Sequence, residues 1–468
     1  MTVPANYQKV CDSIDIQSLI DMIVIETYIN NVDWATEYMN NWITWRATAP
    51  DDSLAYADGK WRYMLYDLDF SADYFDDARS LVGFDSLNNL YMGGDPYNFV
   101  PMFYNLLNNK DFADQFYNSY IDIMKNNFEP VRVSAKLDEF VEKYKEIIMI
   151  TNTRFDQEWV NLNYNSEIEA FRQFFIGRRN LAKMYLDRLY GKETNMTIGA
   201  DILSDESGWS YYGDAKASKS DGTFTLTANK ACLNSWDIQS QSKTFTIEKG
   251  KTYKVTFEAS CSTGTPIGMS INHQVGTSWP SCFSKSGISL TNDFKEYSFT
   301  FVSAHNTASD WRLCIDFGNG AGVYTIRNAS ITPVSFDTEL VNAVGYWELF
   351  DPAGYGEFTV NAPDSITVKK NTNGGEVQPF YSGIVLDAGK NYTLSFTAKS
   401  DTNRDIGVNV WTDEGDIITE NASVGTTAKK FTYTFTADEQ CMDASIFFIC
   451  GGDAGTIEFS DISMICKN

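Results

Sequence analysis

The sequence predicts a multidomain protein in which a mainly α-helical domain with a small β-hairpin precedes two β-sandwich domains of the jelly-roll type. Its 468 residues exceed what one ordinary hydrophobic core organises, so we expect roughly two to four domains. Apolar residues follow helical spacing up to Gly191, and short alternating strands take over beyond it. The strand-rich half also repeats itself, which predicts two similar sandwiches rather than one.

The first 190 residues are expected to form helices around one hairpin. Asp15 is predicted to cap a helix that is buried nearly all round, because apolar residues fill most of its surface. Later helices are expected to start at Asp111, Ser134 and Asn165, and the last of them to stop at Gly191. Residues 42–46 and 61–67 are predicted to be two strands joined by a polar turn.

An internal repeat sets the domain count of the second half. Gln239, Phe257 and the Gly-Lys pair at 250–251 recur as Gln378, Phe396 and the pair at 389–390, all at one constant offset. After a loop of different length the register resumes. We therefore expect domains at residues 1–192, 196–334 and 335–468, with a linker at residues 192–195.

Charge and composition exclude several classes of partner. The formal net charge is −25 and the pI about 4.4, so we expect neither nucleic acid nor an anionic membrane as a partner, because both are polyanions. No stretch approaches the roughly 18 apolar residues of a membrane helix. Residues 1–20 lack the features of a signal peptide. Either the chain is cytoplasmic or its native N-terminus is truncated here.

The cysteines and histidines do not predict a metal site. None of the eight cysteines forms a Cys-x-x-Cys pair, and His273 and His305 are the only histidines, so a zinc site is not expected. Disulfides are permitted but not required.

A group of acidic and amide side chains carries the most informative pattern. Asn31-Val32-Asp33-Trp34 is followed by Asn40-Asn41 and, at the end of the second predicted strand, by Asp67-Leu68-Asp69. With residues 14–21, 42–46, 61–66 and 174–179, these motifs make the stretch from residue 14 to about 189 resemble the C-terminal part of the CotH kinase family, a family of atypical kinases. The family's Arg- and Lys-bearing segment that grips the phosphates lies upstream of the similar stretch, so we expect the C-terminal lobe only.

The resemblance implies a role for each residue in magnesium-dependent phosphoryl transfer from ATP to a secreted protein. Asp33 would orient the acceptor hydroxyl, and Asn41, or Asn40 in its place, would bind magnesium with Asp67 and Asp69. The Asn pair lies seven and eight residues after Asp33, whereas the family usually has it four and five after. Whether the chain is an enzyme stays open. The alternatives are a structural adaptor without chemistry, and glycoside hydrolysis with Asp33 and Asp67 as facing carboxylates.

Each sandwich resembles the carbohydrate-binding modules of the family 4/9 type. The first copy shows residues 236–239, 247–253 and 326–331, and the second shows residues 386–392, 396–398 and 457–463. Such a module needs flat aromatic faces for the sugar rings and a few amides or carboxylates for the hydroxyls. The predicted carbohydrate-binding residues are Trp209, Tyr211, Trp236, Gln239 and Trp279 in the first copy, and Gln378, Tyr381 and Trp411 in the second.

Two further expectations follow from the same resemblance. Gly375 stands where the first copy has Trp236, so the second copy is expected to bind a different glycan or none. Asn328 and Asp461 lie in the closing strands, where a structural calcium is held in modules of this type. Taken together, we expect an extracellular or cell-surface protein that carries a CotH-type domain and is tethered to polysaccharide, such as xylan or β-glucan, by two modules.

Overall fold

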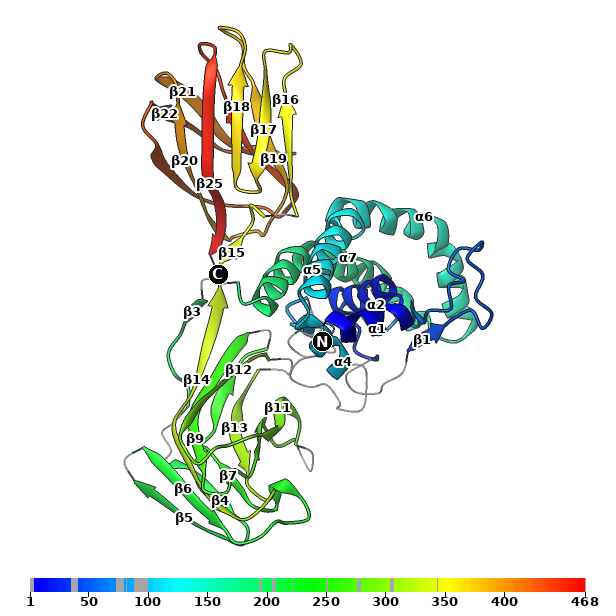
Figure 1. Ribbon diagram of the computed structural model, residues 1–468, viewed down its shortest axis with the longest axis vertical. Coiled ribbons are helices and arrows are strands. Elements are labelled where there is room, and N and C mark those ends of the chain that lie inside the picture. The colour runs from blue at the N-terminus through cyan, green and yellow to red at the C-terminus, as the bar shows by residue number, and fades with distance from the viewer. Residues whose placement is uncertain are drawn as a thin grey trace.

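The computed structural model describes residues 4–34, 41–72, 80, 82–87, 100–192, 196–203, 208–220, 222–249, 251–275, 279–303, 307–342 and 344–467. Helices form the N-terminal part, and two β-sandwiches extend from it in opposite directions (Figure 1). This confirms the predicted fold class. Within the described residues, no helix is both long enough and apolar enough to cross a membrane.

The described helices of the N-terminal part are α1 (Pro4–Ser13), α2 (Ile16–Tyr28), α4 (Val100–Leu107), α5 (Lys110–Asn126), α6 (Pro130–Arg154) and α7 (Glu158–Leu189). Asp15 caps α2, its carboxylate accepting a hydrogen bond of 3.1 Å from the amide of Ser18. Helix α2 is buried over most of its surface, as predicted. Helices α6 and α7 begin earlier than the predicted starts at Ser134 and Asn165, and in α6 Pro130 follows the capping carboxylate of Glu129.

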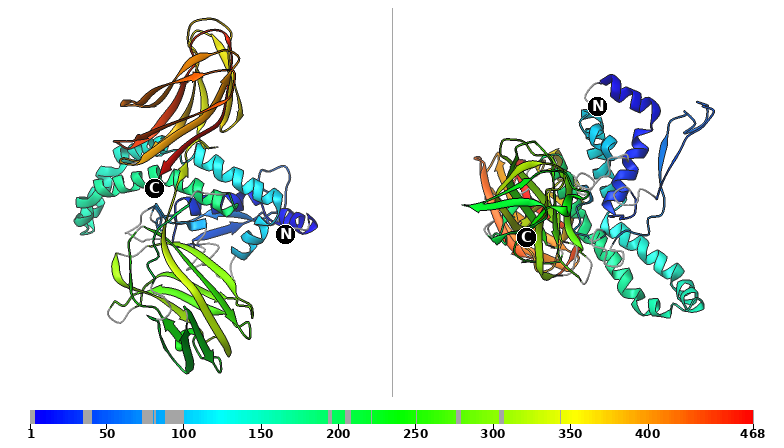
Figure 2. Two further views of the ribbon diagram at one scale, coloured as in Figure 1. Left: turned by 90° about the vertical axis from the view of Figure 1, so that its left-hand side faces the viewer. Right: turned by 90° about the horizontal axis from the view of Figure 1, so that it is seen from below.

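Arg178 joins the long helix α7 to the end of α2. Its side chain is almost fully buried, and its guanidinium donates to the carbonyls of Thr27, Tyr28, Val82 and Phe84 at 2.6–3.0 Å. The last carbonyls of α2 have no partner within the helix, so the guanidinium satisfies groups that burial would otherwise leave unpaired. Figure 2 shows the end of α6 and the start of α7 projecting together away from both sandwiches.

The predicted hairpin consists of β1 (Trp42–Trp45) and β2 (Arg62–Leu65), which pair antiparallel with Trp42 opposite Leu65. Its two faces differ because side chains alternate along each strand. Trp42 and Tyr63 pack against the helical core, whereas Ile43 and Met64 are exposed on the other face. The hairpin therefore packs on the helical core mainly by the face that carries Trp42 and Tyr63.

The first sandwich is built from two antiparallel sheets, β11-β10-β13-β7-β4 and β12-β9-β14-β6-β5, with β8 and β3 added at their sides. Its elements are β3 (Met196–Ile198), β4 (Ser210–Tyr212), β5 (Ala215–Ser220), β6 (Thr223–Ala228), η3 (Ser235–Asp237), β7 (Gln239–Gln241), β8 (Phe245–Ile247), β9 (Thr252–Cys261), β10 (Ile267–Asn272), β11 (Ser281–Ile288), β12 (Lys295–Val302), β13 (Ala308–Asp316) and β14 (Gly322–Phe336). Apolar side chains from the inner faces of both sheets form one core.

The second sandwich repeats this plan with sheets β22-β21-β24-β19-β16 and β23-β20-β25-β18-β17, and β15 pairs with β25. Its strands are β15 (Thr338–Glu339), β16 (Tyr346–Phe350), β17 (Gly356–Ala362), β18 (Ser365–Lys370), β19 (Gln378–Leu386), β20 (Asn391–Ser400), β21 (Arg404–Thr412), β22 (Gly415–Val424), β23 (Lys429–Thr436), β24 (Cys441–Ile449) and β25 (Gly455–Lys467). A second core lies between the sheets.

Asn328 and Asp461 mark the same irregularity in both copies. Each has a left-handed backbone, with φ of 53° and 51°, at a place where the closing strand shifts register against its neighbour. Asn and Asp tolerate this conformation better than other residues with a side chain. The shared bulge supports the repeat and gives these two residues a backbone role.

The helical part packs against the second sandwich. Arg179 of α7 is buried and donates to the carbonyl of Val344 at 2.9 Å. The ammonium group of Lys125 lies 3.9 Å from the ring centre of Tyr346, whose hydroxyl donates to the Lys125 carbonyl at 3.0 Å. This contact fixes one end of the sandwich against α5 and α7.

Candidate functional sites

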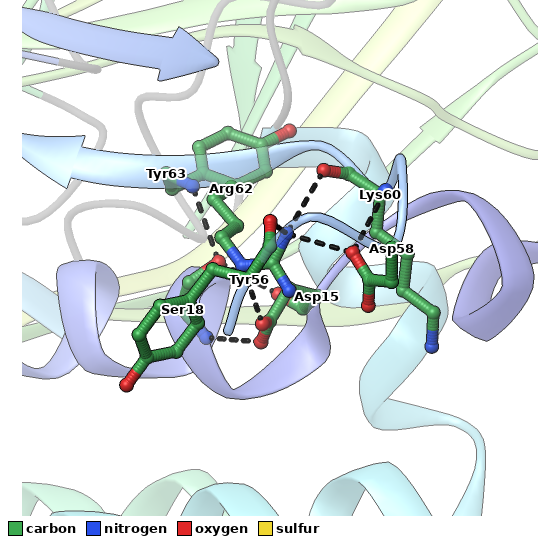
Figure 3. A network of polar contacts seen from close by, with 7 residues as sticks. All are labelled: Asp15, Ser18, Tyr56, Asp58, Lys60, Arg62 and Tyr63. Carbon is green, nitrogen blue, oxygen red and sulfur yellow. Dashed lines mark hydrogen bonds and ion pairs between the residues drawn. The ribbon is translucent and has the colours of Figure 1, made fainter. Parts of the chain in front are cut away.

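The hairpin that carries the acidic motif is held to α2 by a network around Arg62 (Figure 3). The Arg62 side chain is buried and lies 3.1 Å from the carboxylate of Asp15 and 2.8 Å from that of Asp58. It also donates to the carbonyl of Tyr56 at 2.8 Å. The amide of Tyr63 donates to the hydroxyl of Ser18 at 3.1 Å. These contacts position β2, and with it the acidic segment that follows.

Backbone hydrogen bonds join the loop after α2 to the segment after β2. The amide of Val32 donates to the carbonyl of Phe70, and the amide of Ala72 donates to the carbonyl of Ile29, both at 2.9 Å. Asp33 is therefore held beside the segment that contains Asp67 and Asp69.

The structure brings the four predicted residues together. The amide of Asn41 donates to the Asp33 carboxylate at 2.8 Å. A hydrogen bond to Asp69 and its negative charge raise the pKa of Asp67, and the charge of Asp33 adds to this. Asn41 and Asp67 both have a left-handed backbone, with φ of 57°. Asn40, the alternative ligand, lies outside the described residues.

Carboxylates gathered in this way suit a cation chemically, because a bound positive charge would relieve the mutual repulsion that raises the pKa of Asp67. The three carboxylates and the Asn41 amide supply the oxygen donors that magnesium prefers. In the described ranges, however, no three His, Cys, Asp or Glu side chains converge as a metal-binding group. The magnesium assignment stays a prediction.

Beneath this cluster lies a buried carboxyl group that sequence reasoning did not assign. Glu26 of α2 is fully buried, and burial raises its pKa to about 8. It accepts a hydrogen bond of 2.9 Å from the side-chain amide of Asn31. The side-chain oxygen of Asn31 in turn accepts a hydrogen bond from the backbone amide of Asp33 at 3.1 Å. A Glu in the middle of an apolar helix was the signal that could have revealed it.

A second candidate site lies on the outer face of the sheet that contains β7 and β13. Tyr212, Gln239, Asp316 and Gly268 are cross-strand neighbours in one row across β4, β7, β13 and β10. Gln239 donates to the Asp316 carboxylate at 2.7 Å. Burial raises the pKa of Asp316, and the hydrogen bond from Gln239 opposes this rise.

The polar side chains of this face form a continuous chain across the sheet. Gln241 donates to the side-chain oxygen of Gln239 at 2.8 Å, and the guanidinium of Arg312 donates to Gln241 at 3.3 Å. The same guanidinium lies 5.5 Å from the ring centre of Trp279. We call Gln239, Gln241, Asp316 and Arg312 the polar row.

Exposed tryptophans lie at the two ends of the polar row. Trp236, on the short helix η3 directly before β7, is 56% exposed. The neighbouring Ser235 hydrogen-bonds to Asp316, so η3 lies beside the row. At the other end, Trp279 is 45% exposed. Trp279 therefore lies at one end of the polar row, and η3, which carries Trp236, lies at the other.

Two predicted residues of the first sandwich have different positions. Trp209 is 1% exposed and packs against Phe224 in the core, so the prediction that it contacts sugar was wrong. Tyr211 pairs with Ser240 and therefore points to the opposite side of the sheet from Gln239. Its neighbour Tyr212 shares the row with Gln239 instead. The sequence of a three-residue edge strand does not show which of its side chains will share a face with those of the neighbouring strand.

In the second sandwich, Gln378 and Trp411 lie on the outer face, but Tyr381 does not. Tyr381 is 1% exposed, and its hydroxyl bonds to the backbone of Asn342 and Gly345, so its assignment to sugar binding was wrong. The side chain of Gln378 donates to Glu376 at 3.1 Å.

The predicted calcium ligands have partners within the protein. The amide nitrogen of Asn328 donates to the Glu258 carboxylate at 2.9 Å, and the Asp461 carboxylate accepts from the hydroxyl of Ser460 at 3.2 Å. Calcium at these positions stays a prediction, and the contacts by themselves account for both residues.

Two family models match the parts of the chain that hold these sites. Residues 3–181 match the CotH kinase protein family model. Residues 195–321 match the family model described as carbohydrate binding domain. The CotH match contains the acidic cluster, and the carbohydrate-binding match contains the polar row and both flanking tryptophans. A search of curated proteins found no match.

Several solved structures are similar to the sandwiches. One, titled "CBM4 structure and function", is 25% identical and covers 26% of this chain and 86% of its own, with a TM-score of 0.24. The CBM22-1–CBM22-2 tandem domain of Paenibacillus barcinonensis Xyn10C is 11% identical. The match covers 59% of this chain and 99% of that one, with a TM-score of 0.31. The N-terminal cellulose-binding domain of Cellulomonas fimi β-1,4-glucanase C is 20% identical. The match covers 26% of this chain and 89% of that one, with a TM-score of 0.23.

Proposed function

We propose that this protein is a polysaccharide-binding protein whose first sandwich holds a glycan chain along the polar row. The observation that carries the proposal is the polar row itself, bounded by exposed Trp236 and Trp279. It lies within the segment that matches the carbohydrate binding domain model.

The chemistry of the face suits a sugar chain. Tryptophan rings pack on the apolar C–H surfaces of pyranose rings, while amide and carboxylate groups read the hydroxyls. Gln239 and Gln241 are already oriented by their hydrogen bonds to one another and to Asp316, so little side-chain freedom is lost on binding. Xylan and β-glucan are the leading candidates. An extracellular or cell-surface location, with attachment to an insoluble polymer, belongs to the same proposal.

Affinity electrophoresis of the full chain in gels containing xylan, β-glucan or mannan tests this proposal. We expect retardation by at least one polymer, and Trp236→Ala to weaken the affinity by about tenfold, as removal of one stacking ring predicts. Phe294→Ala, which removes an exposed ring that packs on Arg327, is the matched control and should migrate as the unaltered protein does. Equal retardation of the unaltered protein and Trp236→Ala would contradict the proposal.

A second candidate function is magnesium-dependent phosphoryl transfer by the helical domain, and the arrangement around Asp33 favours it. Asp33 would orient the acceptor hydroxyl, with its carboxylate held by Asn41. Asn41, Asp67 and Asp69 would hold the metal. Magnesium, when bound, would neutralise charge on the transferred phosphoryl group.

Transfer of labelled phosphate from ATP to the chain itself or to a general protein substrate tests this second candidate. We expect Asp69→Asn to abolish the transfer. Asp52→Asn makes the same change in the loop of the same hairpin, away from the cluster, and should leave it unchanged. No binding of ATP with magnesium by the unaltered chain would instead support a structural adaptor role for this domain.

A further inference from the structure

We propose that the second sandwich carries its own glycan site, an aromatic platform that binds the flat apolar face of a neutral β-linked polysaccharide. This inference rests on the proposed function of the first sandwich and extends it to a site with different chemistry. Phe380, Phe447 and Trp411 form the platform.

The platform occupies the same place as the polar row. A Cβ added at Gly268 would meet the side chain of Asp316 at 3.1 Å, and one added at Gly407 would meet that of Ile449 at 3.1 Å. Both glycines pair directly with those residues across equivalent strands, β10 with β13 and β21 with β24. The two outer faces can therefore be compared position by position.

This comparison shows a polar face converted into an apolar one. Phe380 replaces Gln241, Phe447 replaces Cys314, Ile449 replaces Asp316 and Trp411 replaces Asn272, while Gln378 keeps the place of Gln239. The hydrogen-bonded chain of the first sandwich has no counterpart among these side chains. Recognition here must rest on surface contact rather than on reading individual hydroxyls.

The rings are arranged as a rigid surface. Phe380 and Phe447 stack with ring centres 4.7 Å apart and an angle of 15° between their planes. Trp411 meets Phe447 edge-on at 6.5 Å and is 40% exposed. Because the rings already pack on one another, little side-chain freedom is lost when a ligand covers them. The side-chain oxygen of Asn409, cross-strand from Phe447, is buried and has no hydrogen-bond partner in the described part of the chain.

The helical domain contacts this sandwich but does not cover the platform. Its contacts involve Val344, Tyr346, Val385 and, at the start of β24, Met442, all towards the end of the sheet nearest α7. Phe350, at the opposite end of β16 from Tyr346, is exposed. The platform thus keeps an open side.

The charge of the surroundings selects a neutral polymer. Glu348 is the cross-strand neighbour of Phe380 and is exposed at the edge of the platform, and the whole chain has a net charge of −25. A polyuronate would be repelled. A neutral β-linked glucan offers flat, apolar ring faces, and chains packed at an insoluble surface offer many of them side by side. We therefore assign insoluble β-glucan to the platform and single soluble chains to the polar row.

Depletion binding of the full chain to insoluble cellulose, measured beside retardation by soluble xylan and β-glucan, tests this assignment. We expect Trp411→Ala to weaken cellulose binding by about tenfold while retardation by soluble polymer is unchanged. Trp236→Ala should do the reverse. Val360→Ala removes an exposed apolar side chain from the other sheet of the same sandwich and should change neither.

The two proposals fail in different ways. Unchanged cellulose binding in Trp411→Ala, or loss of all cellulose binding in Trp236→Ala, would overturn the platform and leave the polar row intact. Unchanged retardation of Trp236→Ala by soluble polymer would overturn the polar row alone. Phe350→Ala, at an exposed position beside the platform, gives a second variant should Trp411→Ala fold poorly.

Discussion

Replacing Glu26 by Gln should stabilise the helical domain in a pH-dependent way. The folded pKa of Glu26 is about 8 because burial penalises its charged form, against 4.5 for the free side chain. A raised carboxyl pKa means that the folded state loses stability as pH rises from 4.5 towards 8, since only the unfolded state ionises freely. At pH 7 this cost is about 3 kcal/mol, and at pH 5 it is below about 1 kcal/mol.

Glu26→Gln removes the ionisation but keeps a side-chain oxygen that can accept from Asn31. Hydrogen exchange of the α2 amides at pH 5 and pH 7, corrected for intrinsic rates, measures the stability of this region. We expect Gln to increase protection at pH 7 by roughly 3 kcal/mol and to change it little at pH 5. Glu142→Gln on α6, whose carboxylate is exposed, is the control. An equal effect at both pH values would refute the reasoning.

Three further substitutions test other parts of the account. Arg178→Met leaves four backbone carbonyls without their donor and should lower the free energy of unfolding by about 3–5 kcal/mol, measured by urea denaturation. Asn328→Val should lower the free energy of unfolding by about 1–2 kcal/mol, because a β-branched residue is strained in the left-handed backbone at this position. Asn328→Gly should lower it less, and thermal unfolding of both variants measures the difference. Gly213→Ala places a Cβ 2.2 Å from the carbonyl oxygen of Asp237 and should weaken retardation by soluble polysaccharide, because it displaces η3.

The sequence was sufficient where one local signal determined the structure. The apolar surface of α2, its Asp15 cap and the two strands of the hairpin were all predicted. The repeat was also readable, because Gln239 and Gln378 recur with their neighbours at a constant offset. Asp33, Asn41, Asp67 and Asp69 were named from their motifs. Asn41 bonds to Asp33 and Asp67 to Asp69, and the catalytic and metal roles of the four stay a prediction.

Sequence reasoning failed where a residue's place depends on distant contacts. Trp209 and Tyr381 were assigned to sugar binding, but both fill cores, and nothing local distinguishes a core ring from a surface ring. Tyr211 and Tyr212 lie on opposite faces of the sheet, and the pairing of β4 with β7 decides which of the two shares a face with Gln239. The contact of Arg179 with Val344 joins segments far apart in the chain, and neither segment alone has a sequence pattern that predicts it.

Calorimetric titration of the full chain with soluble xylan and β-glucan oligosaccharides tests glycan binding by the polar row most directly. Gln239→Ala removes the hydrogen bonds that link Asp316 to Gln241 but leaves Trp236 and Trp279 in place. We predict measurable binding of at least one oligosaccharide by the unaltered protein, and about tenfold weaker binding with a less favourable enthalpy in Gln239→Ala. Binding of the same affinity and enthalpy in both proteins would contradict the account.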